Sequence, residues 1–330
     1  MSGNGSRPAA RQRTWIKDLK AGSDVEELFA VRSADLRQRR GGGPYVAAVL
    51  GDRTGEVTAL VWQNVERYRD VFEPGNVIAV KGQVQRYNQQ LQIVVRSADR
   101  VADEDVDQDV FVRSSSVDPV VLWRQLTGLI EGIGDADLKQ LLFRVFSNPE
   151  VERLMKVAPA ARSMHHAFRT GLLEHTVSVT TVARDLARHY RVSEDLVVAG
   201  ALLHDLGKIW ELEIGPSIEY TDDGRLLGHL TMETLFVERA ISELERFPSE
   251  TRRHLLHILL AHHGEYEYGS PRRPKTPEAM LVHMVDNLDS KIAGMLEAIA
   301  EGGETEEAWT AYSPILGRHV YRRRPPTAKK

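Results

Sequence analysis

The stretch AGALLHDLGKI, residues 199–209, places a histidine, a carboxylate and an amine in an otherwise apolar segment. His204 and Asp205 are adjacent, and Lys208 follows about one helical turn later. Burying unpaired charge costs several kcal/mol, so side chains of this kind need a partner inside the protein. A bound metal ion would supply that partner, and the stretch therefore indicates a metal site.

Five histidines and two aspartates in the second half of the chain have the residue types of metal ligands. Each lies in or at the end of an expected helix, and a helix bundle can direct such side chains toward one point. Imidazole and carboxylate suit Mn, Fe, Co, Ni or Zn rather than a softer metal. Seven ligands exceed the needs of one ion and would suffice for two ions that share a carboxylate. The residues are His175, His204, Asp205, His229, His262, His263 and Asp286.

Strand signals fill the chain from Thr14 to about Val101. Two apolar runs flank a hairpin turn at residues 52–55, and a second pair of runs flanks a turn near Asn88. Between the pairs, NVERYRDVFEPG predicts a short helix or turn that ends at Pro74-Gly75. About five strands and one short helical insertion predict an OB-fold β-barrel.

Helical periodicity begins after the acidic stretch ADEDVDQDV. Asp118-Pro119 predicts an N-cap and the first residue of a helix, and Thr276-Pro277 predicts the start of the last one. We expect a multidomain β-then-α fold, in which the barrel precedes an all-α helix bundle. The expected helices of the bundle cover residues 171–189, 193–209, 226–246, 249–263 and 277–300. The expected divisions are a disordered tail (1–13), the barrel (14–102), an acidic linker (103–117), connecting helices (118–160), the ligand-bearing helical domain (161–312) and a basic C-terminal tail (313–330). Within that last tail, YRRRPPTAKK is expected to be disordered.

Charge is distributed unevenly along the 330 residues. Residues 1–102 contain 16 Lys and Arg against 11 Asp and Glu, whereas the whole chain has a net charge of -4. A basic front region suggests a module that binds a polyanion. The chain contains no cysteine, which excludes Cys-ligated zinc, and no apolar run approaches the roughly 18 residues of a membrane span. Because the first residues also lack the apolar core of a signal peptide, we expect a cytoplasmic protein without membrane association.

The ligand motifs resemble those of the HD phosphohydrolase superfamily, in which a His, an adjacent His-Asp pair and a distant Asp bind a metal. The additional His229, His262 and His263 are similar to the dinuclear HD subset. Longer strings, among them HHAFRTGLLEHT, AGALLHDLGK, HHGEYEYGSPRRPKTPEA and VDNLDSK, follow an OB-like domain and resemble the YhaM-type 3′–5′ exoribonucleases over most of residues 14–300. No GYP triplet follows the His pair, which argues against a cyclic-dinucleotide phosphodiesterase of the HD-GYP type.

The resemblance implies two divalent ions, and we expect Mn²⁺ first, with Fe, Co, Ni or Zn as alternatives. One ion would be held by His175, His204, Asp205 and Asp286. The other would be held by His229, His262 and His263, with Asp205 as the bridge. Two cations about 4 Å apart stabilise the attacking and leaving oxygens of a phosphodiester together. Lys208, on the helix face of Asp205, would neutralise a phosphate oxygen, so Asp205 and Lys208 are the expected catalytic residues.

Nucleic-acid contacts are expected from aromatic and basic side chains. OB-folds stack bases on aromatic rings and bind phosphates through cations. The candidates in the barrel are Tyr45, Trp62, Lys81, Arg86 and Tyr87, although Tyr45 and Trp62 would alternatively fill the barrel. In the helical domain, His165 and His166 are expected near the substrate path. Arg272, Arg273 and Lys275 are expected either to bind phosphates or to form a solvated loop.

Our first functional expectation is a metal-dependent 3′–5′ exoribonuclease that hydrolyses single-stranded RNA, and also single-stranded DNA as a further substrate, to nucleoside 5′-monophosphates. The polarity rests on the resemblance alone. The second is an HD hydrolase of nucleotides or cyclic dinucleotides with a regulatory OB domain. The third is a non-catalytic nucleic-acid-binding protein. The sequence leaves a homo-oligomer open.

Overall fold

The computed structural model describes residues 13–39, 41–88, 90–102, 106–107, 110–162, 167–301, 307–313 and 316–323. The chain divides into two compact units. The first comprises residues 1–113 together with 215–217, and the second comprises residues 114–214 and 218–330. The expected tail at 1–12, parts of the expected linker and residues 324–330 lie outside the described residues.

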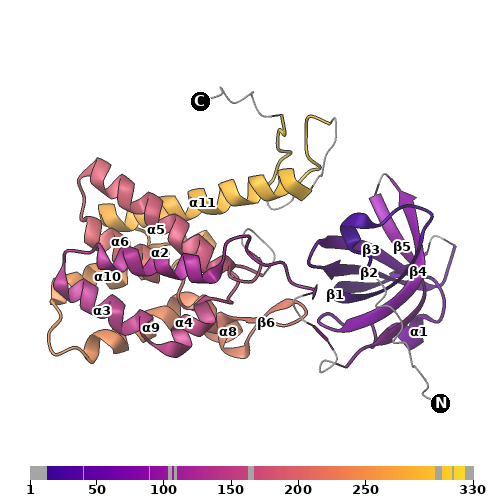
Figure 1. The fold of residues 1–330 in the computed structure, drawn as a ribbon, viewed down its shortest axis with the longest axis horizontal. Helices are drawn as coiled ribbons and strands as arrows, with labels where there is room; N and C mark the ends of the chain where they lie inside the picture. The colour runs from indigo at the N-terminus through magenta and orange to yellow at the C-terminus, as the bar shows by residue number, and fades with distance from the viewer. Residues whose placement is uncertain are drawn as a thin grey trace, which may run out of the picture. The chain divides into compact units, whose positions relative to one another are not determined.

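A closed five-stranded barrel with the strand order β1-β2-β3-β5-β4 forms the first unit (Figure 1). Closure depends on the length of β1, whose first half pairs with β4 and whose second half pairs with β2. The elements are η1 (Ile16–Asp18), β1 (Asp24–Gln38), β2 (Pro44–Asp52), β3 (Gly55–Val61), α1 (Val65–Tyr68), β4 (Val77–Tyr87) and β5 (Gln90–Arg100). The five strands and the short helix confirm the expected small barrel.

Alternating apolar residues fill the barrel. In β2, for example, Val46, Ala48 and Leu50 are buried, as the two-residue period of a strand requires. Phe111, which belongs to the range expected as an acidic linker, is also buried in this unit, against Ala30. The expectation of a linker is therefore wrong for this residue, because its ring adds to the apolar core of the first unit.

Helices make up most of the second unit. They are α2 (Pro119–Glu131), α3 (Ala136–Phe146), α4 (Pro149–Met155), α5 (Gly171–Tyr190), α6 (Glu194–Leu203), α7 (Lys208–Glu211), α8 (Asp222–Leu227), α9 (His229–Ser242), α10 (Ser249–Ala261), η4 (Tyr266–Tyr268) and α11 (Pro277–Glu301). The short strands β6 (Leu212–Ile214) and β7 (Ile218–Tyr220) form a two-stranded sheet. No helix among the described residues has both the length and the apolar character that crossing a membrane requires.

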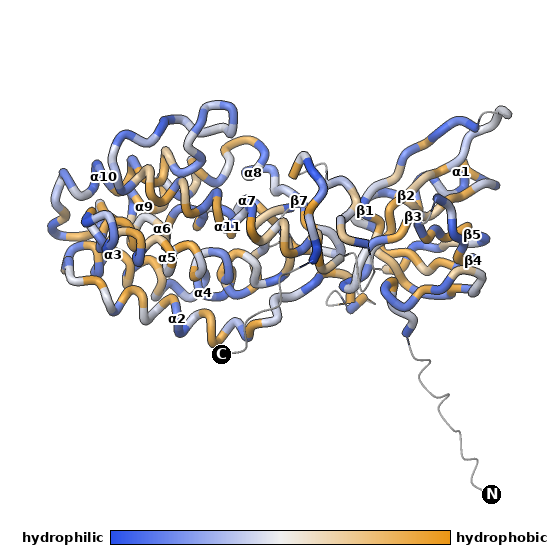
Figure 2. The backbone as a smooth tube through the Cα atoms, turned by 90° about the horizontal axis from the view of Figure 1, so that it is seen from above, coloured by the Kyte–Doolittle hydropathy of each residue, from blue (hydrophilic) through white to orange (hydrophobic). Residues whose placement is uncertain are grey.

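The central helix of this unit is α6. Every residue from Leu196 to Leu203 is buried, and α5, α10 and α11 pack around the helix. In Figure 2 the inner helices carry hydrophobic stretches in orange, whereas outer turns of the bundle are blue. A helix that is apolar all round is stable only inside such a core, so α6 holds the residues that follow it at a fixed position.

Start signals read from the sequence are confirmed at two helices. The side chain of Asp118 accepts a hydrogen bond from the backbone of Val120, and Pro119 begins α2. The hydroxyl of Thr276 accepts from the backbone of Ala279 in the first turn of α11. Both caps satisfy backbone N–H groups that have no partner within the helix.

Two expected helices are broken in the structure. The helix predicted over 193–209 ends at Leu203, and a separate short helix begins at Lys208. The helix predicted over 226–246 is divided at Gly228, whose φ of 72° lies in the left-handed region. The β6–β7 hairpin between them was not predicted, because its strands have only three residues each.

The first part of the expected basic tail is also structured. Trp309 pairs with Tyr321 and Ser313 with Arg318 in isolated antiparallel bridges, and Val320 is buried. Disorder was expected for residues 321–330, of which the structure describes 321–323, and the expectation is wrong for Tyr321, because its backbone pairs with that of Trp309.

Candidate metal centre

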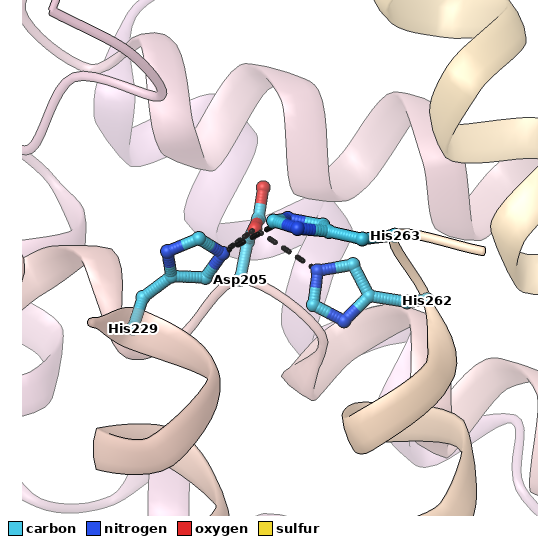
Figure 3. A group of neighbouring side chains, drawn as sticks. All are labelled: Asp205, His229, His262 and His263. Carbon is cyan, nitrogen blue, oxygen red and sulfur yellow. Dashed lines mark hydrogen bonds and ion pairs between the residues drawn. The ribbon is translucent and has the colours of Figure 1, made fainter. Parts of the chain in front are cut away.

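The seven predicted ligands form two groups that meet at one aspartate. His175, His204, Asp205 and Asp286 constitute the first group, and Asp205, His229, His262 and His263 constitute the second. Within each group the candidate ligand atoms lie within 4.8 Å of one another. Figure 3 shows the second group, in which the three imidazoles converge on the carboxylate of Asp205.

Asp205 faces the two groups with different oxygens. Its Oδ2 lies 3.4 Å from Nε2 of both His175 and His204, in the first group. Its Oδ1 lies 3.6 Å from Nε2 of both His229 and His262, in the second group. A carboxylate with this orientation can bind one ion through each oxygen, which is the arrangement of a bridging ligand.

Helix ends position most of these side chains. His204 directly follows α6, His229 is the first residue of α9, and His262 and His263 directly follow α10. His175 and Asp286 lie within α5 and α11. Four helices thus direct their ends or inner faces at one point, while α6 fixes the adjacent His-Asp pair at the centre.

Close backbone packing at the centre requires glycine at two positions. A Cβ atom on Gly207 would lie 2.2 Å from the carbonyl oxygen of His229. A Cβ atom on Gly264, whose φ is 81°, would lie 2.1 Å from the ring of His283. The turn after α6 and the turn after α10 can therefore approach their neighbours only because these residues lack a side chain.

All five imidazoles are oriented by a hydrogen bond at Nδ1. The acceptors for His204 and His262 are the carbonyl oxygens of Ala201 and Leu259, at 2.7 and 2.8 Å. His263 donates to the carbonyl oxygen of Tyr268, His229 to the carboxylate of Glu211 and His175 to the carboxylate of Asp289. Because these oxygens accept, each Nδ1 donates, so Nε2 is the ring nitrogen that faces the cluster.

The donor set fits divalent metal ions. Nε2 of His262 is buried without any hydrogen-bond partner in the described structure. Nε2 of His229 lies 3.2 Å from Nε2 of His263. Two nitrogen ligands about 2.1 Å from one metal ion are separated by about 3–3.5 Å, so this spacing is that of ligands around a cation. Burial lowers the pKa of His204 to about 4 and that of His263 to about 3, which keeps both rings neutral near pH 7.

Lys208 lies beside the carboxylate of Asp205. Its Nζ donates to Oδ2 of Asp205 at 2.7 Å. The expected helical spacing is wrong in one respect, because the helix ends before the pair and Lys208 begins α7 instead. The turn nevertheless brings the amine of Lys208 beside Asp205, as predicted. The amine adds a positive charge to the cluster of acids and imidazoles without being a candidate metal ligand.

Three buried or half-buried acids support the centre and were not predicted. Asp289 accepts from Nδ1 of His175 at 2.8 Å, and Glu211 accepts from Nδ1 of His229 at 2.9 Å. Glu233 is fully buried, and burial raises the pKa of its carboxyl group well above the usual range. Asp289 had one signal in the sequence, since it lies three residues after Asp286 and therefore on the same helix face.

His283 also lies against the centre. Its Nδ1 donates to the carbonyl oxygen of His262 at 2.7 Å. It therefore contacts the backbone of a candidate ligand and fixes the turn that carries the ring.

The aromatic candidates of the barrel fall at two different places. Tyr45 and Trp62 stack with ring centroids 4.6 Å apart, and the guanidinium of Arg39 lies 4.9 Å from the Trp62 ring. Both rings are half-buried and neither belongs to the barrel core, so the alternative that they fill the barrel is wrong. Arg86 and Tyr87 are exposed at the end of β4.

The register of the strands explains this separation. Thr58 of β3 pairs in parallel with Gln92 of β5, so the β4–β5 turn lies near the beginning of β3. Trp62 follows the end of the same strand. Lys81, the remaining candidate, is exposed in the middle of β4 and forms an ion pair of 2.6 Å with Glu26.

The other predicted nucleic-acid contacts have mixed positions. His165 and His166 lie outside the described residues. Arg273 forms an ion pair with Glu265 at 2.8 Å and lies over the ring of Tyr266, and Arg272 is exposed in the same loop. This loop directly follows the His262-His263 pair. Lys275 is exposed, and its backbone N–H donates to His257.

Comparison with known proteins agrees with the two units. The model of the HD domain matches residues 172–291, and that of an OB-fold nucleic acid binding domain matches residues 29–100. The chain is 30% identical over 295 residues to a protein of Bacillus subtilis named 3′-5′ exoribonuclease YhaM, which covers 88% of this chain and 93% of that protein. It is 32% identical over 292 residues to a protein of the same name from Halalkalibacterium halodurans, with 87% and 90% covered. The HD match and the cluster of histidines and aspartates together indicate divalent-metal binding.

Proposed function

The chain belongs to the family of the YhaM 3′–5′ exoribonucleases, and we propose that it removes nucleotides one at a time from the 3′ end of single-stranded RNA with the help of two divalent ions, preferably Mn²⁺. The observation that carries this proposal is the position of Asp205, whose two oxygens face two separate groups of ligands. A single carboxylate shared in this way fits a pair of ions better than one ion.

The residues of the chain have distinct tasks in this reaction. The first ion would be held by His175, His204, Asp205 and Asp286, and the second by Asp205, His229, His262 and His263. Bound there, the ions would supply electrostatic stabilisation of the attacking and leaving oxygens of the phosphodiester. Hydrolysis of the terminal bond releases a nucleoside 5′-monophosphate and leaves a 3′ hydroxyl on the shortened strand.

Lys208 contributes charge rather than coordination. Its ammonium group lies 2.7 Å from the carboxylate of Asp205, at the edge of the cluster. From there it can meet a phosphate oxygen on which negative charge grows during the reaction, and such stabilisation lowers the barrier more than it strengthens substrate binding. This is the role that we assign to it.

The barrel supplies a surface for the body of the strand. The stacked pair of Tyr45 and Trp62, with the guanidinium of Arg39 over the second ring, combines an aromatic platform with a cation. Single-stranded nucleic acids bind such surfaces through base stacking and phosphate contacts without strong sequence preference. We therefore propose single-stranded RNA as the partner of this unit, and single-stranded DNA as a weaker one.

The test uses an RNA labelled at its 5′ end, the same RNA in circular form, and mononucleotides and cyclic dinucleotides as competing substrate classes. We expect a descending ladder from the linear RNA, no cleavage of the circle, loss of activity in EDTA and recovery on addition of Mn²⁺. The variant Asp205→Asn should abolish hydrolysis while RNA binding persists. Cleavage of the circle, release of 3′-monophosphates or full activity of the metal-stripped protein would contradict the proposal.

A further inference from the structure

A small paired segment follows α11, at the end of the chain that the structure describes (Figure 1). The backbone N–H of Thr310 donates to the carbonyl of Val320, and that of Arg322 donates to the carbonyl of Ala308, each at 2.8 Å. A further hydrogen bond joins the backbone of Val320 to the hydroxyl of Thr310. The backbone of the segment is therefore held by hydrogen bonds, and two of its own residues, Thr310 and Val320, are buried.

The aromatic side chains of this segment are exposed. Trp309, Tyr312 and Tyr321 retain 55%, 55% and 50% of their surface in contact with solvent, while Thr310 and Val320 beside them are buried. Trp309 packs edge-on against Tyr321 with ring centroids 5.0 Å apart, and Tyr312 packs against His319 at 5.5 Å. The rings thus hold one another in place and leave much of their surface open, although burying them would stabilise the fold.

The charge of the segment differs from that of the unit around it. Residues 308–323 contain three Arg and no Asp or Glu, whereas residues 103–307 contain 21 Arg and Lys and 36 Asp and Glu. Arg318 is exposed and pairs with Ser313 across the segment. A positive, aromatic surface on an acidic helical unit is complementary to a polyanion that carries planar groups.

We propose that Trp309, Tyr312, Arg318, His319 and Tyr321, here called the C-terminal aromatic surface, form a second binding site for single-stranded RNA. The site would hold nucleotides that lie further from the 3′ end than the one being removed. This inference rests on the proposed function, because it assumes that the substrate is a strand. Aromatic rings accept any base by stacking, and arginine binds the phosphates, so the site would bind RNA without sequence specificity.

Binding is measured in the full-length chain with the substitution Asp205→Asn, which prevents hydrolysis. The probe is a fluorescent RNA of about 20 nucleotides, followed by anisotropy at several salt concentrations. Trp309→Ala with Tyr321→Ala should weaken binding about tenfold or more, since each base–aromatic stack contributes appreciably. The pair Trp309→Phe and Tyr321→Phe should retain most of the affinity. Arg318→Gln should lower the slope of log affinity against log salt by about one contact.

A matched control is Phe143→Ala, which removes another exposed aromatic ring from the helical unit, on α3. It should leave binding unchanged. In chains with Asp205 intact, the alanine pair should slow degradation of the long RNA while cleavage of a dinucleotide keeps its wild-type rate. This comparison separates a binding surface from damage to the metal centre.

Three outcomes would overturn the inference. The first is an RNA affinity that neither the alanine pair nor Arg318→Gln changes. The second is a loss of RNA affinity in Phe143→Ala as large as in the alanine pair. The third is self-association of the wild-type chain, seen by light scattering, that the alanine pair abolishes while RNA affinity is unaffected. The last would assign the rings to an interface between copies of the chain. Failure of the wild-type chain to degrade RNA would instead refute the proposed function, whether or not the surface binds the probe.

Discussion

Removing the carboxylate charge of Asp289 should weaken one of the two proposed metal sites without changing any candidate ligand atom. Asp289 accepts from Nδ1 of His175 at 2.8 Å and also from the hydroxyl of Ser178. The substitution Asp289→Asn keeps the size of the side chain but leaves only one accepting oxygen for these two donors. One donor must then face an NH₂ group, and the imidazole loses the negative charge that orients it and increases its basicity.

The magnitude follows from the role of such partners in metal sites. Loss of a carboxylate that supports a histidine ligand lowers metal affinity about 10- to 100-fold, which corresponds to about 1.4–2.7 kcal/mol. Only the group that contains His175 should be affected, because His175 is the candidate ligand that Asp289 orients. We therefore expect one weakened ion and one unchanged ion per chain.

A second substitution makes the assay specific for each site. Glu211→Gln should weaken the other group by a similar factor, because Glu211 accepts from His229. Mn²⁺ titration, followed by calorimetry or by electron paramagnetic resonance, would count the ions and give their affinities. Asp185→Asn, an exposed acid on α5, is the matched control. If both variants bound two ions with wild-type affinity, or if both weakened the same ion, the assignment of supporting acids would be refuted.

Three further changes test other parts of the structure. Lys208→Ala should retain both ions but lower kcat about 100-fold, with little change in substrate affinity. The reason is that the ammonium beside Asp205 acts on negative charge that grows in the transition state. Metal analysis and steady-state kinetics check this prediction. The metal-free protein should lose stability as pH falls from about 6.5 toward 4 and 3. The folded pKa values of His204 and His263 lie near 4 and 3, below the unfolded value of 6.5, so these two residues bind protons in the unfolded chain before they do so in the folded one. Thermal unfolding at several pH values measures the loss. Gly207→Ala should destabilise the fold by about 1–3 kcal/mol, because the new methyl group meets the backbone at the start of α9, and denaturant unfolding would detect the loss.

The candidate ligands that the structure brings together could be named from the sequence because each is an unusual residue in an apolar helical setting. His204 and Asp205 follow eight buried residues of α6, a context in which solvated polar side chains are not expected. The barrel could also be predicted, since apolar and polar residues alternate along the strands with a period of two and the turns carry residues typical of turns. Periodicity and residue type therefore predicted the main strands and helices and the candidate ligand side chains.

The supporting residues and the breaks between helices could not be predicted in the same way. Glu211 and Asp289 are ordinary acids in sequence, and their partners lie 18 and 114 residues away. The helix break before Lys208 is accompanied by a close approach of Gly207 to the backbone of α9 that no local sequence pattern reveals. Such features arise from tertiary packing, which overrides the apolar continuity of the segment.

The Nδ1 hydrogen bonds of the five imidazoles have a consequence for the lifetime of the protein. They hold Nε2 of His229 and Nε2 of His263 3.2 Å apart, so the folded chain offers a bound cation two nitrogens at once, which the unfolded chain does not. Ions that bind only the folded state stabilise it by about 2.7 kcal/mol at 100 times their dissociation constant. The fraction of chains open to proteases at any moment is therefore set in part by free metal, and a shortage of the ions would reduce the amount of this protein as well as its turnover.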